Sequence, residues 1–131
     1  MSVKKELDFA TISNDYYLCN LIKTDSAVIV KLGDIELFFE GCLILKCGYP
    51  NEEIYMHYDF YDSIDKYCLF EVIESSWLKE IIEMNKVHPR HNDESFKNYK
   101  HFMILFEDEI FECISVKYEV VYGNGGNGSK M

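Results

Sequence analysis

Residues 100–116 read KHFMILFEDEIFECISV, and this stretch carries the strongest structural signal in the chain. Two apolar runs, 100–106 and 109–116, flank the acidic pair Glu107-Asp108, a pattern typical of a β-hairpin. Branched and aromatic side chains, which favour strands, dominate both runs. The hairpin predicts a fold built around an antiparallel sheet.

Other apolar runs extend this sheet. Gly33-Asp34 joins Ala27–Leu32 to residues 35–39 as a two-residue hairpin loop. Residues 41–47 are almost continuously apolar, which predicts a central strand covered on both faces, with a bend at Gly41. Four further segments are predicted strands: residues 16–22, an antiparallel pair formed by 54–61 and 67–73, and a last strand at 118–122.

One segment changes to helical periodicity. Over residues 76–86, Trp77, Leu78, Ile81 and Ile82 share one face of a helix. A serine at position 75 or 76 caps its N-terminus, and we expect Trp77 to dock the helix onto the sheet.

These elements predict an α+β fold: one twisted antiparallel sheet of six to eight strands, partly closed into a barrel as an alternative, with one amphipathic helix. Residues 1–122 form a single globular domain. The glycine-rich residues 123–131 form a flexible tail.

Composition limits the partners. The 131 residues include 23 acids and 13 bases, which gives a net charge of -10. Such a surface repels phosphate backbones and anionic lipids, so we expect no direct nucleic-acid or membrane binding, whereas a basic protein is attracted. The start of the chain lacks a signal-peptide pattern, and the five cysteines are an odd number. Both features favour a cytoplasmic protein with reduced cysteines that act as small core hydrophobes.

Aromatic rings and carboxylates alternate in the segment 55–67. On a strand, Met56, Tyr58 and Phe60 face the core, and the alternate residues face solvent. Tyrosine buries area at low entropic cost, so this exposed face predicts a partner-binding surface. Its residues are Tyr55, His57, Asp59, Tyr61, Asp62 and Asp65. The alternative is that these rings are ordinary half-buried sheet residues.

A second candidate site lies just after the helix. Its residues are His88, Arg90, His91, Asp93 and His101, which suit a metal ion or a phosphate-bearing ligand. The alternative is a polar loop whose rings cap the helix. No residue pattern indicates catalytic residues, and no cofactor is expected.

The segment from Trp77 onward, including His88-Pro89 and Phe111-Glu112-Cys113, resembles a group of small, largely uncharacterised bacterial proteins with the same helix, His-Pro loop and final hairpin. This resemblance implies no activity. In size and charge the chain is also similar to toxin-immunity proteins and phage-encoded inhibitors of bacterial defence.

Together these observations predict a non-catalytic domain that neutralises a basic macromolecular partner, as an immunity or inhibitor protein does. Two alternatives stay open. One is a metal- or phosphate-binding protein or enzyme that uses the His88–His91 loop, and the other is a homodimer joined through an open sheet edge.

Overall fold

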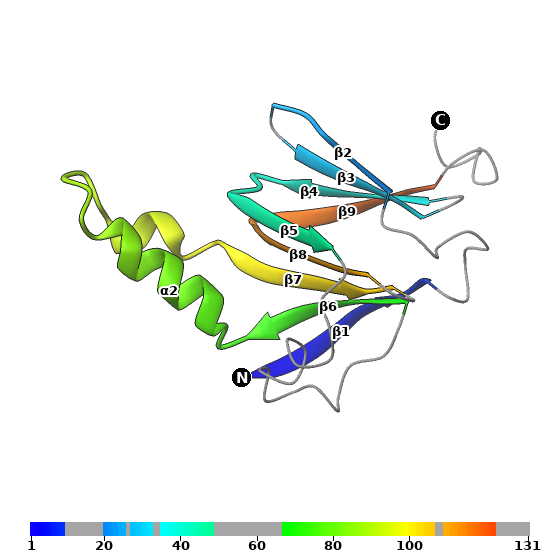
Figure 1. Cartoon of the computed structure of the whole chain (residues 1–131), viewed down its shortest axis with the longest axis horizontal. Coiled ribbons are helices and arrows are strands. Elements are labelled where there is room, and N and C mark those ends of the chain that lie inside the picture. The colour runs from blue at the N-terminus through cyan, green and yellow to red at the C-terminus, as the bar shows by residue number, and fades with distance from the viewer. Residues whose placement is uncertain (10–19, 26, 33–34, 49–66, 107–108, 123–131) are drawn as a thin grey trace.

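The computed structural model describes residues 1–9, 20–25, 27–32, 35–48, 67–106 and 109–122. In these ranges it contains nine strands, one α-helix and one short 3-10 helix (Figure 1). The strands are β1 (Ser2–Asp8), β2 (Asn20–Lys23), β3 (Ala27–Leu32), β4 (Ile35–Glu40), β5 (Ile44–Gly48), β6 (Cys68–Ile73), β7 (Lys100–Leu105), β8 (Ile110–Ser115) and β9 (Lys117–Tyr122). The helices are α2 (Ser76–Asn85) and η3 (Asp93–Phe96).

The strands form two separate antiparallel sheets. The five-stranded sheet has the order β1-β6-β7-β8-β5, and the four-stranded sheet has the order β2-β3-β4-β9. The α+β class and the antiparallel pairing are therefore confirmed. The prediction of one sheet with six to eight strands is wrong for the described residues, because their nine strands divide between two sheets that pack against each other. The alternative of a partly closed barrel is wrong for the same reason.

The predicted hairpin is confirmed as β7 and β8, which lie inside the five-stranded sheet. Leu105 pairs with Ile110, and the Phe106 amide donates to the Glu109 carbonyl at 2.8 Å. The last predicted strand is also present, as β9. It pairs with β4 and so belongs to the other sheet.

The chain changes sheets between β1 and β2, between β4 and β5, and between β8 and β9, and the last two of these crossings are neighbours. One is Gly41, between β4 and β5, whose φ of 64° favours glycine. A Cβ at Gly41 would lie 3.0 Å from Val116 Cγ2. The other crossing is Val116, between β8 and β9, whose amide donates to the Glu40 carbonyl at 3.0 Å. The bend predicted at Gly41 is confirmed, and its role is to change sheets.

The core fills the space between the sheets, and Phe39 lies at its centre. The Phe39 ring is fully buried, with its centroid 5.5 Å from that of Phe102 and 5.3 Å from that of Phe111. Phe39 belongs to the four-stranded sheet and the other two rings to the five-stranded sheet. A second link is the Tyr118 hydroxyl on β9, which donates to Glu6 Oε1 on β1 at 3.1 Å.

Burial patterns differ between the two sheets. In β3 and β4 buried and partly exposed residues alternate strictly, whereas all six residues of β8 are buried. The four-stranded sheet is therefore buried on one face only, and β8 is covered on both.

The interpretation of residues 41–47 as a central strand is wrong. β5 begins only at Ile44 and lies at the end of the strand order, with β8 as its neighbour. Leu43 and Ile44 are 46% and 43% exposed. Since Gly41 and Cys42 belong to the crossing, the apolar run does not mark one buried strand.

Other predictions were partly met. The polar strand β1 was not predicted, and it pairs with one side of β6 while β7 pairs with the other. The segment 54–61, expected to pair with 67–73, lies outside the described residues. The predicted strand 16–22 is described only from Asn20 onward, in β2.

The predicted helix is confirmed with its cap. The Ser75 side chain accepts from the Leu78 amide at 3.0 Å. Trp77 contacts the sheet as expected, with its ring 5.0 Å from the His101 ring, edge to face. The first turn of the helix therefore contacts the face of the five-stranded sheet opposite the core, and Figure 1 shows α2 running on past the ends of β6 and β7.

We predict that Phe39→Ala lowers the free energy of unfolding by about 3–5 kcal/mol, because it removes a ring from the contact between the sheets. Phe38→Ala makes the same truncation one residue away on the outer face, and it should cost about 1 kcal/mol. Urea unfolding followed by circular dichroism measures both. Equal costs would contradict the two-sheet core.

Candidate functional site

The predicted ring-and-carboxylate surface falls outside the described part of the chain. Its six residues are Tyr55, His57, Asp59, Tyr61, Asp62 and Asp65. That surface therefore stays a prediction, and a candidate site has to be built from the residues that the structure describes.

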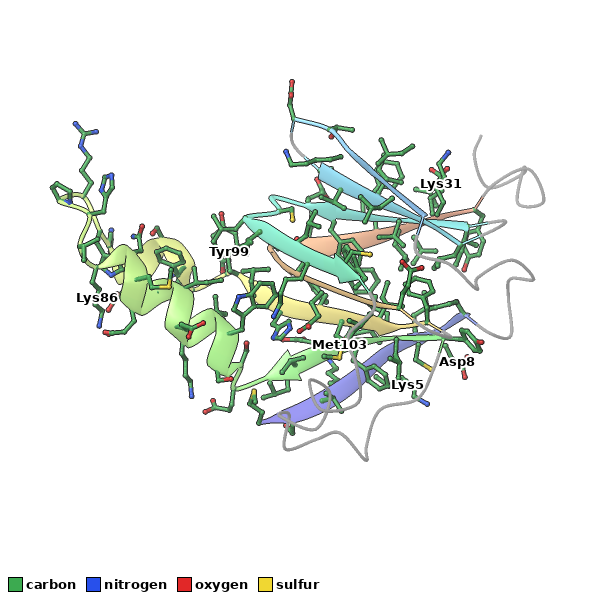
Figure 2. The ribbon with its side chains drawn as sticks, viewed as in Figure 1. Lys5, Asp8, Lys31, Lys86, Tyr99 and Met103 are labelled. Atoms are coloured by element: carbon green, nitrogen blue, oxygen red, sulfur yellow. The ribbon has the colours of Figure 1, made fainter. Side chains whose placement is uncertain are left out.

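The histidine loop is described, and its side chains bond to one another locally. His91 Nε2 is hydrogen-bonded to Asp93, and His91 Nδ1 lies 2.8 Å from Asn85 Nδ2. His88 Nδ1 accepts from the Arg90 amide at 3.1 Å. These contacts fold the loop back on the end of α2, where Figure 2 shows Lys86 far from both sheets.

His101 does not join this loop. Its Nδ1 lies 2.8 Å from Ser75 Oγ and its Nε2 lies 2.7 Å from Glu112 Oε1. All three residues are buried. The structure thus pairs His91 with Asp93 and His88 with Arg90 but leaves His101 elsewhere, and no group of three or more metal-ligating side chains gathers among the described residues.

The network around His101 closes on itself, and we name its five residues the His101 clasp: Lys46, Ser75, Trp77, His101 and Glu112. The Lys46 ammonium lies 3.7 Å from Glu112 Oε2 and 4.1 Å from the centre of the Trp77 ring. Cation–π contact, ion pairing and hydrogen bonds therefore join α2, β5, β7 and β8.

A serine, a histidine and a carboxylate that are joined by hydrogen bonds are also the parts of a catalytic triad. Here the Ser75 hydroxyl caps α2, and Ser75 is only 5% exposed. The arrangement therefore acts as a structural clasp. Sequence reasoning found the serine and the tryptophan but missed Glu112, although a carboxylate within an apolar strand opposite a histidine-bearing strand was an available signal.

The outer face of the four-stranded sheet combines apolar side chains with acids. The registers place Ile22 beside Ile29, Ile29 beside Phe38, and Phe38 beside Glu119. Ile22 is 43% exposed, and Ile29 and Phe38 are half-buried. This row of three apolar side chains therefore crosses three strands and ends at a carboxylate.

A cavity of about 570 Å³ opens on this row. It is lined by Ile29 and Phe38, by the β2–β3 connection and by residues Glu40 to Cys42. Among the described residues that line it, Asp25, Glu40 and Glu119 supply carboxylates and Lys23 supplies an ammonium group. We name the apolar row, these four charged residues and the cavity the acidic face. An apolar floor with a negative rim is the chemistry that was predicted for the segment 55–67.

Glu40 shows how incompletely the carboxylates of this face are neutralised. The Lys117 ammonium lies 3.3 Å from Glu40 Oε2, within the range of an ion pair. That oxygen nevertheless has no hydrogen-bond donor with suitable geometry among the described residues. Glu40 therefore carries a buried carboxylate oxygen whose ion-pair partner in the described part of the chain is the Lys117 ammonium.

A second apolar hollow of about 340 Å³ lies between β5 and α2, bordered by Leu43, Ile44, Ile81 and Met84. Its other described lining residues are Asn85 and Phe96, so none of the described residues that line it is charged. It therefore offers apolar area without selecting the charge of a ligand. The acidic face offers apolar area and also selects the charge of a ligand.

Comparison of the chain with protein-family models, with curated proteins and with solved structures finds no match. Within the described ranges, none of the helices has the length and apolar character needed to cross a membrane.

We predict that Ser75→Ala lowers the free energy of unfolding by about 2 kcal/mol, because it removes the helix cap and leaves His101 Nδ1 without its partner. Thermal and urea unfolding measure the effect. Ser76→Ala is the matched control one position later. Its exposed hydroxyl donates to the Met1 sulfur in the described part of the chain, so its cost should stay within about 0.5 kcal/mol. Equal costs for the two variants would show that the clasp contributes nothing.

Proposed function

We propose that the protein is a non-catalytic domain that binds a basic protein partner, and that the acidic face is the surface it uses. The observation that carries this proposal is the cavity, in which Ile29 and Phe38 form an apolar floor beneath three carboxylates. Buried apolar area supplies affinity in such an interface, while the charges select and orient the partner.

The charge of the whole chain supports the same kind of partner. A net charge of -10 creates a field that accelerates the approach of a basic protein and slows the approach of an acidic one. It also disfavours a second copy of this chain as the occupant, because two acidic faces repel each other. Lysine or arginine side chains of the partner would approach Glu40 and Glu119.

An immunity or inhibitor role in the cytoplasm is the specific form of this proposal. Proteins that act on nucleic acids carry basic surfaces for phosphate groups. An acidic domain can occupy such a surface with carboxylates in place of phosphates. The predicted ring-and-carboxylate surface at 55–65 would extend the same chemistry.

We predict that Glu119→Lys combined with Phe38→Ala weakens binding of the partner at least about tenfold, because it reverses one rim charge and removes the largest ring of the row. The partner is recovered from the native host on immobilised wild-type protein, identified, and produced in pure form. Isothermal titration calorimetry at low and at physiological salt then gives the affinity of each variant.

Glu80→Lys on α2 is the charge-matched control, because Glu80 is an exposed acid remote from the acidic face. Its affinity should equal that of the wild type, and wild-type binding should weaken as salt is added. The proposal fails if the recovered partner is itself acidic. It also fails if the two charge-reversal variants bind equally well.

A further inference from the structure

Two thiols lie close together where the chain passes from one sheet to the other. Cys42 follows Gly41 at the crossing and is half-buried, and its Sγ lies 3.6 Å from the Ile44 carbonyl oxygen. Cys113 lies on β8 inside the core and is fully buried. The Ser115 hydroxyl donates to Cys113 Sγ at 3.4 Å.

Cys42 faces two environments. On one side it packs against the core cluster that contains Cys113. On the other side it lines the 570 Å³ cavity of the acidic face. The Cys42 thiol therefore lies between the core, which contains Cys113, and the open cavity.

The surroundings of Cys42 favour its thiolate. Hydrogen bonding from the Cys113 thiol is the main cause that lowers the pKa of Cys42 to about 6, and the Ser115 hydroxyl and the Lys23 charge act in the same direction against the effect of burial. Burial raises the pKa of Cys113 well above its usual value, so Cys113 keeps its proton. Asp25, Glu40 and Glu119 are the negative groups that line the cavity with Cys42.

We propose that Cys42 is a thiol–disulfide exchange site for small disulfides that enter the cavity of the acidic face, with Cys113 as the positioning residue that stabilises its thiolate. Cys42 Sγ attacks one sulfur of the disulfide and forms a new S–S bond. The original S–S bond breaks, and the other half leaves as a thiolate that takes a proton from water. Cys42 is oxidised to a mixed disulfide, and the departing half is reduced to a thiol.

This inference does not depend on the proposed partner. Sequence reasoning treated the cysteines as inert core residues because nothing in the sequence brings Cys42 and Cys113 together. Only the crossing between the sheets, which places the start of β5 beside β8, makes the pair.

The test uses cystamine, because its ammonium groups suit the carboxylates that line the cavity. The full chain is treated at a series of pH values, quenched with acid, and mapped by peptide mass spectrometry. Mixed disulfide at Cys42 should form with a rate midpoint near pH 6. In urea, where the fold is lost, the same residue should show the midpoint of an ordinary thiol, about pH 8.5. At pH 6 the folded chain should react about tenfold faster at Cys42 than the unfolded chain.

Two variants test whether Cys113 stabilises the Cys42 thiolate or whether Cys42 reacts simply because it is exposed. Cys113→Ala removes the donor and should raise the midpoint at Cys42 by about one pH unit or more, whereas Cys113→Ser keeps a hydroxyl donor and should stay near the wild type. If Cys113→Ala does not fold, Ser115→Ala should raise the midpoint by a smaller amount. The proposal is overturned if folded and unfolded chains share one midpoint, or if mixed disulfide does not form at Cys42.

Discussion

The packing of Phe39 against Phe102 and Phe111 is the contact on which the rest of the structure depends. It joins two sheets that share no strand pairing between them, and each sheet alone would leave one apolar face in water. Because the core buries one face of the four-stranded sheet, every second side chain along its strands lies on the opposite, outer face. The outer row of Ile22, Ile29 and Phe38 is therefore a consequence of the core, because a β-strand sends successive residues to opposite faces.

The five-stranded sheet differs, because β8 is covered on both sides. The buried Glu112 carboxylate therefore needs partners within the protein. His101 is hydrogen-bonded to it, and Lys46 forms an ion pair with it. The same histidine is hydrogen-bonded through Nδ1 to the serine that caps α2. The helix is thus held by a polar network with a defined geometry, since none of its own residues is fully buried.

Part of this organisation could be predicted from the sequence. The hairpin 100–116, the strand pair around Gly33-Asp34 and the capped helix follow from local pattern, and all are present. Strand partners could not be predicted in the same way, because alternation fixes which residues share a face but not which strand lies beside another. The pairing of β4 with β9 joins segments about 80 residues apart, and the polar strand β1 has too few apolar residues to give a signal.

The candidate site could likewise be predicted only in part from the sequence. Ile29 and Phe38 could have been assigned to an exposed face from their alternation with buried neighbours, whereas the neighbourhood of Cys42 and Cys113 exists only because the chain changes sheets between β4 and β5. Hydrogen–deuterium exchange of the complex with its purified partner tests the central claim most directly. The account predicts slower amide exchange in peptides from β2, β3, β4 and β9 on binding, with α2 unchanged. Protection confined to α2 and the loop after it, with the four-stranded sheet unchanged, would contradict it.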